Sequence, residues 1–152
     1  MEQDKLKVSS LTPLLGGEGN GTLVAEEGAS LSSGSLRLYY LLRSSSRRGA
    51  GGEAAGCVDL YAYDPLNRRA AVGIMVATEY RRQGYALAML HSLQQLATDN
   101  WHLHSLYADI AESNAASIAL FAKAGYRQCG LFHQWLNVND QYIDSIRMQK
   151  IL

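Results

Sequence analysis

The chain has 152 residues, 47% of them hydrophobic, and its 14 basic and 14 acidic side chains leave a formal net charge of zero. This length suits one domain with a core of ordinary size, so we expect a single domain over residues 1–152. The charge balance and apolar content argue against a disordered chain and against a partner recognised mainly by charge, such as nucleic acid.

The first third of the chain is weakly patterned. Residues 5–15 are compatible with one strand, whereas residues 16–35 are rich in Gly and Ser, which indicates a loop. Residues 35–43 alternate apolar and other side chains as a half-buried strand does. Residues 44–53 predict a flexible hairpin loop, and residues 54–64 predict the strand that returns from it.

The middle of the chain alternates between strand and helix patterns. Residues 70–77 form a continuous apolar run, which is typical of a strand buried on both faces. From Tyr85 to about Thr98 the apolar residues recur with a helical period. Residues 104–111 alternate again and predict a second buried strand.

A shorter helix is expected between Asn114, a suitable N-cap, and Gly125, a suitable residue just beyond the helix end. The remaining residues predict a hairpin around Asn139 and Asp140. The expected order is β-β-β-α-β-α-β-β, which defines an α/β (α+β) fold with helices packed on a mixed sheet.

Few features favour a metal, a disulfide or a membrane. Cys57 and Cys129 are too few for a disulfide framework, which favours a reducing compartment. His102 and His104 have no evident third ligand nearby, so we expect no metal site. The sequence shows no signal-peptide pattern and no apolar run that could span a bilayer. We therefore expect a soluble, cytoplasmic protein without a membrane partner.

The junction between the apolar run and the first helix, residues 79–86, has the chemistry of an anion site. A helix N-terminus exposes unpaired N–H groups and the positive end of the helix dipole. Gly84 lets a phosphate approach the backbone, and Arg81 and Arg82 can bind phosphate oxygens in a bidentate fork. Neither a three-glycine dinucleotide motif nor a Gly-Lys-Ser/Thr phosphate loop is present. A plain surface turn is the alternative for this junction alone.

Two further motifs favour a phosphate loop. The spacing Arg81-x-x-Gly84-x-Ala86 resembles the coenzyme A pyrophosphate loop of the GNAT superfamily of N-acetyltransferases. The stretch from Asn114 to Tyr126 resembles that family's Asn-x-x-(Ala/Ser)-ϕ-x-ϕ-Tyr-x-x-x-Gly-Phe motif. The tail over 139–148 is similar to the hairpin of the branch that holds spermidine acetyltransferases and ribosomal-protein N-terminal acetyltransferases. The resemblance covers residues 55–152, and it implies a splayed sheet that binds acetyl-CoA as cosubstrate.

The resemblance also implies a set of site residues. The acetyl group would lie where the strands 70–77 and 104–111 separate, and a free N–H near Met75 would stabilise the oxyanion. Lys123 is better explained as a solvated helix charge than as a ligand contact. The cofactor-binding residues that the resemblance implies are Ile74, Met75, Val76, Arg81, Arg82, Gln83, Gly84, Tyr85, Ala86, Asn114, Ser117, Phe121 and Lys123.

The sequence departs from the family pattern at the proton donor. The tyrosine that commonly protonates the leaving thiolate is replaced by Phe121, and a phenyl ring cannot donate a proton. Tyr107, Tyr126 and Ser117 are the other hydroxyl donors in this region. The catalytic candidates are Tyr126 and Ser117 as proton donors and Met75 for the N–H that stabilises the oxyanion. The candidates for a general base are the carboxylates Asp59, Asp64 and Glu112.

The N-terminal third also departs from the family, which builds much of its acceptor pocket there from two helices. Residues 12–35 show no convincing amphipathic helix. The acceptor site is therefore expected to be shortened, open, or completed by a partner chain, as in a homodimer. The sequence favours an N-acetyltransferase that acts on a small amine or a peptide N-terminus. A non-catalytic acyl-CoA-binding module of the same fold is the alternative.

Overall fold

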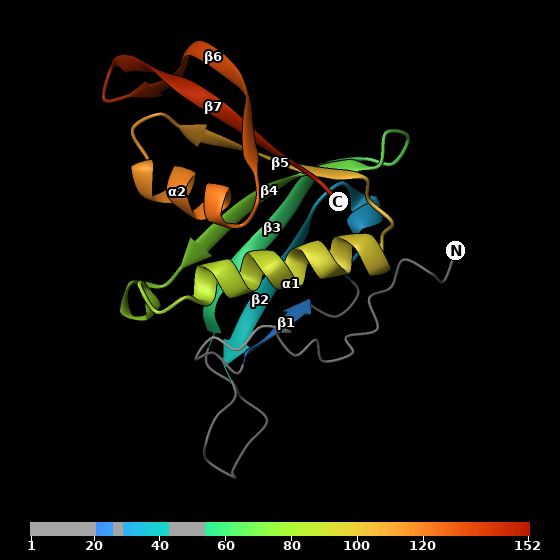
Figure 1. Cartoon of the computed structure of the whole chain (residues 1–152). Coiled ribbons are helices and arrows are strands. Elements are labelled where there is room, and N and C mark those ends of the chain that lie inside the picture. The colour runs from blue at the N-terminus through green and yellow to red at the C-terminus, as the bar shows by residue number, and fades with distance from the viewer. Residues whose placement is uncertain (1–20, 26–28, 43–53) are drawn as a thin grey trace.

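The computed structural model describes residues 21–25, 29–42 and 54–152 (Figure 1). Within these ranges, seven strands form a single sheet and two α-helices pack on it. The strands are β1 (Gly21–Ala25), β2 (Leu36–Leu42), β3 (Ala54–Asp64), β4 (Arg69–Val76), β5 (Ser105–Ala111), β6 (Arg127–Val138) and β7 (Gln141–Ile151). The helices are α1 (Tyr85–Asp99) and α2 (Ala115–Lys123), with short 3-10 turns η1 (Leu31–Ser33) and η2 (Thr78–Tyr80).

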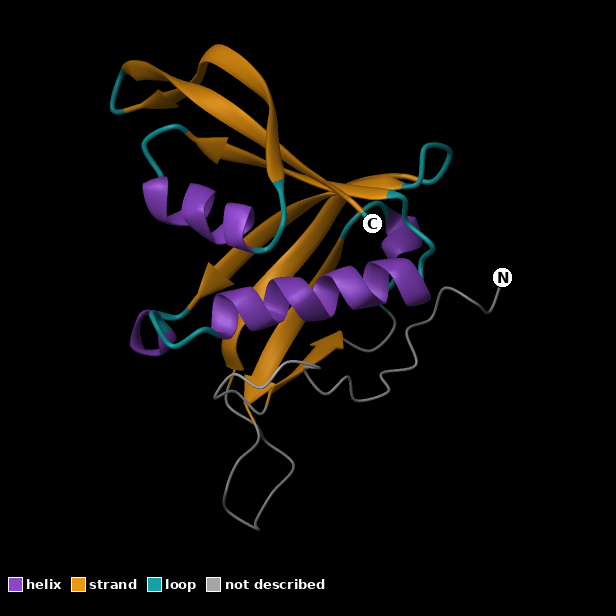
Figure 2. Cartoon of the chain, viewed as in Figure 1, coloured by secondary structure: helices purple, strands orange, loops and turns teal. Residues whose placement is uncertain are grey.

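The sheet has the order β1-β2-β3-β4-β5-β7-β6. Every neighbouring pair is antiparallel except β4 and β5, which run parallel. Both α-helices lie on the same face of the sheet (Figure 2), and α1 packs mainly against β3 and β4. We call this side the helix face and the opposite side the far face.

The core lies between α1 and the helix face of the sheet. The face of α1 predicted from the helical period is buried at Met89, Leu90, Leu93, Leu96 and Ala97. Alternate strand residues point toward this helix because successive side chains of a strand point to opposite faces. The strand residues buried in this cluster include Leu38, Tyr40, Val58, Leu60, Ala70, Val72, Leu106, Ala108 and Met148.

The structure corrects the prediction for residues 16–35. Residues 21–25 form β1, and Leu31–Ser33 form a 3-10 turn, so four strands precede the first helix within the described ranges, where the expected order has three. Leu23 of β1 is buried, and β1 pairs antiparallel with β2. Thr22 and Val24 favour a strand, and pairing and burial stabilise it although the surrounding residues are rich in Gly and Ser. The strand considered for residues 5–15 and the hairpin loop expected over 44–53 lie outside the described residues.

The second half of the chain confirms its predicted elements. The Asn114 side chain caps α2 by accepting a hydrogen bond from the Ser117 backbone N–H (3.2 Å), and Gly125 has a positive φ of 94° after the helix. Asn139 and Asp140 both have positive φ, 52° and 61°, as the tight turn between β6 and β7 requires.

The parallel pair β4–β5 separates early. The strands pair only from Arg69 with Ser105 to Ala71 with Tyr107, although β4 continues to Val76 and β5 to Ala111. Beyond Ala71, β4 still pairs with β3 and β5 still pairs with β7. The sheet therefore opens into a gap between the carboxyl ends of β4 and β5, which confirms the predicted splay.

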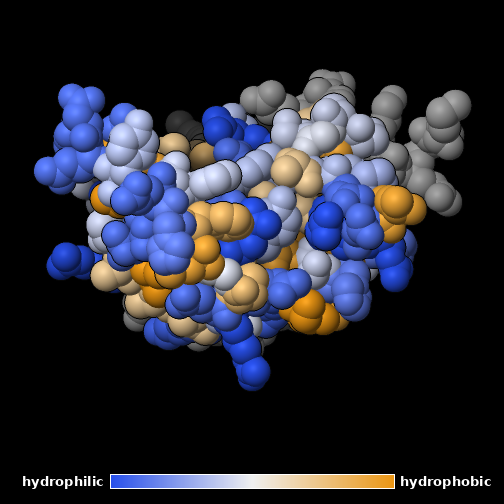
Figure 3. Space-filling model, turned by 90° about the horizontal axis from the view of Figure 1, so that it is seen from above, coloured by the Kyte–Doolittle hydropathy of each residue, from blue (hydrophilic) through white to orange (hydrophobic). Residues whose placement is uncertain are grey.

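The surface seen from the side of the β6–β7 hairpin carries both hydrophobic and hydrophilic side chains. In the coloured part of Figure 3, hydrophobic patches are small and separated by hydrophilic side chains. In the ranges 21–25, 29–42 and 54–152, the helices are too short or too polar to cross a bilayer.

Candidate functional site

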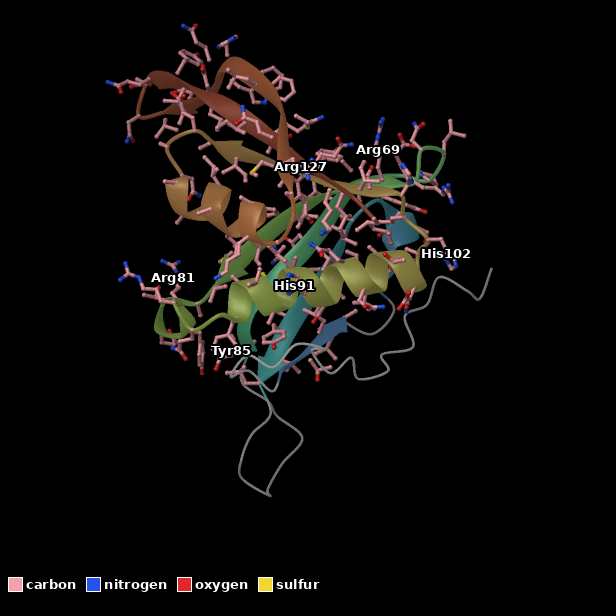
Figure 4. The ribbon with its side chains drawn as sticks, in the orientation of Figure 1. Arg69, Arg81, Tyr85, His91, His102 and Arg127 are labelled. Atoms are coloured by element: carbon pink, nitrogen blue, oxygen red, sulfur yellow. The ribbon has the colours of Figure 1, made fainter. Side chains whose placement is uncertain are left out.

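The loop between β4 and α1 is shaped to leave the start of α1 open. Gly84 is the N-cap residue of α1, with a φ of 84° and no side chain to bond the first N–H groups. An ideal Cβ at Gly84 would meet no atom within 4 Å, so the space above this helix terminus is open. Arg81 projects from the same loop at the N-terminal end of α1 (Figure 4). Unpaired N–H groups, the helix dipole and a guanidinium thus favour an anion here.

A cavity of about 690 Å³ extends from this loop to the gap between β4 and β5. One wall comes from the end of β4 and the loop, and the other comes from α2. Of the predicted cofactor residues, eleven line this cavity: Ile74, Met75, Val76, Arg81, Arg82, Gly84, Tyr85, Ala86, Asn114, Ser117 and Lys123.

The backbone of β4 turns polar groups toward the gap. The N–H of Ala77 donates to the carbonyl oxygen of Ala55 (2.8 Å), and the Met75 carbonyl oxygen lies against Gly56, so both face β3. Backbone groups of successive strand residues point to opposite edges. The N–H and C=O groups of Ile74 and Val76 therefore point to the edge that β5 has left. The Val76 carbonyl oxygen accepts a hydrogen bond from Arg81 Nε (3.0 Å).

Two predicted cofactor residues do not line the cavity. The side chain of Gln83 is exposed and donates to the Glu79 carbonyl oxygen (3.0 Å). Phe121 is 3% exposed and packs in the core, edge-on to the ring of Tyr126 at 4.9 Å between centroids.

The two hydroxyl candidates for catalysis have opposite settings. Ser117 lines the cavity, whereas Tyr126 is 2% exposed and does not. Burial raises the pKa of the Tyr126 hydroxyl, an effect that the nearby Gln94 side chain partly opposes. This hydroxyl makes no hydrogen bond of normal geometry to the described residues. Of the two, only Ser117 is placed to meet a molecule in the cavity.

Four cavity residues were not among the sequence candidates: Tyr80, Leu87, Ala116 and Leu120. The helical spacing of Ala116 and Leu120 with Lys123 could have identified them as one face of α2. Tyr80 belongs to η2, and its ring meets the ring of Tyr85 edge-on at 6.0 Å. No period in the sequence indicates this contact, because it depends on how the loop turns.

The carboxylates considered as general bases have other partners. Asp59 forms a bidentate pair with Arg37 (2.7 and 2.8 Å), and Asp64 pairs with Arg69 (3.1 Å). Glu112 Oε1 accepts from the Asp144 backbone N–H (3.4 Å) at the end of β5. In the described part of the chain, no group of His, Cys, Asp or Glu side chains is placed to hold a metal ion.

The fold and the loop define the class of protein. A mixed sheet that splays between two parallel strands, with an open helix N-terminus beside the gap, is the architecture expected from the sequence motifs. A family model described as "Acetyltransferase (GNAT) domain" matches residues 26–127. The chain belongs to this family.

The curated relatives that match are spermidine acetyltransferases. The chain is 31% identical over 98 residues to spermidine N(1)-acetyltransferase of Escherichia coli K12, a match that covers 64% of this chain and 52% of that protein. It is 25% identical over 93 residues to the enzyme of the same name from Vibrio cholerae, covering 61% and 54%. The chain thus spans about half the length of the curated relatives it matches.

Solved structures confirm the fold. The chain is similar to spermidine N-acetyltransferase from Vibrio cholerae in complex with CoA and spermine, with a TM-score of 0.70 and 21% identity over 79% of this chain and 67% of that one. A dodecameric structure of spermidine N-acetyltransferase from the same organism matches with a TM-score of 0.69 and 21% identity over 78% and 65% of the two chains.

Proposed function

We propose that this protein transfers an acetyl group from acetyl-CoA to an amine by direct attack. The observation that carries the proposal is the cavity that joins an open helix N-terminus to the gap between β4 and β5. It brings together, from two separate sequence motifs, groups suited to a phosphate and groups suited to an amide-containing arm. The relatives named as spermidine acetyltransferases support the same reaction class.

In this proposal the coenzyme lies along β4 and the loop. The pyrophosphate binds the N–H groups at the start of α1, with Arg81 and Arg82 adding charge. The pantetheine arm then pairs with the backbone groups of Val76. Asn114, Ser117 and Lys123 contact the coenzyme from the side of α2. Tyr85 and Ala86, at the start of α1, pack beside the phosphates.

The oxyanion donor follows from the same placement. The thioester lies farther from the loop than the pantetheine, nearer to Ala71, where β4 and β5 still pair. Because the groups of Met75 face β3, we assign the donor near Met75 to the N–H of Ile74, which faces the gap. One such donor typically contributes about 3–4 kcal/mol to the transition state. The side chain of Met75 then borders the acetyl group.

The proton donor for the thiolate is the least usual part of this site. Phe121 has no hydroxyl, and Tyr126 is buried away from the cavity with a raised pKa. We assign the donation to the Ser117 hydroxyl, acting with solvent. A donor of this kind is a weak acid, so a moderate turnover rate is expected.

A specific observation favours the second candidate, a non-catalytic acyl-CoA-binding module. The ring at the usual acid position is a phenylalanine in the core, so the coenzyme site could persist without efficient transfer. The acceptor in the catalytic case is a small amine or a peptide N-terminus. The two candidates agree on acetyl-CoA and differ only in turnover.

One experiment separates these outcomes. Thermal unfolding is followed with acetyl-CoA, and free CoA release is followed with a panel of amines and short peptides. Binding at about 100 times the dissociation constant should stabilise the fold by roughly 2.7 kcal/mol. Stabilisation with CoA release supports the transferase, and stabilisation without release supports the binding module. The absence of any stabilisation at millimolar acetyl-CoA contradicts both.

A further inference from the structure

The gap between β4 and β5 also opens toward the far face of the sheet. Met75 belongs to the far-face set of β4, opposite the core residues Val72 and Ile74. Its side chain is 60% exposed, yet it also lines the cavity. The cavity therefore reaches through the splay, from the loop and α2 on the helix face to Met75 on the far face.

Polar and aromatic side chains gather on the far face beside this opening. Asp109 lies on β5 two residues beyond Tyr107, where the strands part, and Gly73 holds the matching position on β4. Asp59 is the cross-strand partner of Gly73. The far-face cluster consists of Arg37, Asp59, Tyr61, Tyr107, Asp109 and Arg147.

The members of the far-face cluster are close neighbours although they come from different strands. An ideal Cβ at Gly73 would lie 3.7 Å from the Tyr61 ring and 4.0 Å from Asp59 Cβ. Burial, and next the nearby Asp109 carboxylate, raise the pKa of the Tyr61 hydroxyl, so the charge of a β5 residue acts on a side chain of β3. These contacts and the strand register place Asp59, Tyr61 and Asp109 around Gly73, two residues before Met75 on the far face.

The two carboxylates of the cluster are both neutralised. Arg37 grips Asp59 with Nε and a terminal nitrogen (2.7 and 2.8 Å), and Arg147 grips Asp109 in the same bidentate way (2.7 and 2.8 Å). Arg147 also lies over the ring of Tyr107 at 4.4 Å and near the ring of Phe132 at 5.1 Å. An arriving ammonium would therefore have to displace a guanidinium from its carboxylate and from an aromatic face.

We propose that Arg37 and Arg147 set the class of the acceptor that meets the acetyl group at the far-face opening. The inference rests on the proposed transferase function. By neutralising Asp59 and Asp109, the two arginines leave no free carboxylate among the described residues of the cluster. The extra positive charges of a polyamine gain no partner there, while an apolar chain can lie against Met75 and Tyr61. The preferred acceptor is a primary monoamine with an apolar substituent.

The test compares two acceptors of similar length, spermidine and octylamine, by kcat/KM for CoA release. The wild-type chain should favour octylamine by about tenfold, a difference of about 1.4 kcal/mol. Arg37→Gln and Arg147→Met each free one carboxylate, so each should shift the ratio toward spermidine by about tenfold. Arg37 is half exposed, so its replacement keeps the test valid if Arg147→Met impairs folding.

The matched control is Arg69→Gln, which frees Asp64 instead. Arg69 lies at the opposite end of the sheet from Arg81 and the gap (Figure 4), so its replacement should leave the ratio unchanged. A wild-type preference for spermidine overturns the inference, and so does a ratio that shifts no more in Arg37→Gln than in Arg69→Gln. If another amine or peptide of the panel is acetylated but neither spermidine nor octylamine is, this inference is overturned and the transferase proposal stands. If acetyl-CoA binds and no acceptor releases CoA, both fail.

Discussion

Substitutions at Gly84 separate backbone strain from charge at the proposed phosphate site. Gly84 has a φ of 84°, where an L-residue costs about 1–2 kcal/mol relative to glycine. A Cβ there would meet no other atom, so Gly84→Ala should introduce this strain and nothing else. For a domain of this size, 1 kcal/mol corresponds to about 2–4 °C, so we expect Tm to fall by roughly 2–8 °C.

Gly84→Glu adds a carboxylate to the same strain. A negative charge at a helix N-terminus is worth about 0.3–1 kcal/mol, so the unliganded variant should be no less stable than Gly84→Ala. The same carboxylate would repel a pyrophosphate from the start of α1. The stabilisation by acetyl-CoA, roughly 2.7 kcal/mol at 100 times the dissociation constant, should persist in Gly84→Ala and vanish in Gly84→Glu.

The measurement is thermal unfolding of the three proteins across a titration of acetyl-CoA. Comparing each variant with and without ligand cancels the strain, since strain affects both curves equally. A full ligand-induced rise in Tm for Gly84→Glu would refute the assignment of the phosphate site to this helix terminus. Loss of the rise in Gly84→Ala as well would show that backbone geometry, and not charge, controls binding.

Three further predictions concern the body of the domain. Tyr126→Phe removes a buried hydroxyl without a hydrogen bond of normal geometry, so the free energy of unfolding should rise by about 1 kcal/mol; denaturant unfolding checks this, and a decrease would contradict it. Asn114→Ala removes the cap of α2 and should destabilise by about 1 kcal/mol, whereas Asn114→Asp should keep the cap; equal stability of the two variants would argue against the capping role. The Gln134 backbone N–H, and then His133, hold the pKa of Asp144 below its ordinary value, so this carboxylate stabilises the fold above that ordinary pKa and loses its contribution as the pH falls through the lowered one. Tm should therefore decline less for Asp144→Asn than for wild type between about pH 5 and pH 3, and parallel curves would exclude the contribution of Asp144.

The second half of the fold could be predicted because its local signals agree with its tertiary contacts. The helical period that ends near Thr98 coincides with the buried face of α1, and Asn114 and Gly125 mark both ends of α2. The strand β1 is missed because its short Thr22-Leu23-Val24 run stands among Gly and Ser residues that indicate a loop. Five residues give a weak local signal, and pairing with β2 and the burial of Leu23 stabilise the strand.

The candidate site divides in the same way. The motif spacing predicted that the loop residues and Asn114 lie at one site, and they line one cavity. The prediction succeeds because the path of the backbone fixes the positions of these residues. The location of Phe121 and Tyr126 depends on which side of α2 meets the core, and the motif alone does not decide this. The far-face pairs Arg37–Asp59 and Arg147–Asp109 join residues 22 and 38 positions apart, and only the strand register brings them together.

The narrow joint between β4 and β5 has a mechanical consequence. Three residue pairs, from Arg69–Ser105 to Ala71–Tyr107, hold two half-sheets together, one of β1 to β4 and the other of β5 to β7. The core cluster under α1 also contains residues of both half-sheets, so it supports this short ladder on the helix face. We expect a ligand in the cavity to act as a spacer that sets how far the unpaired ends of β4 and β5 stand apart.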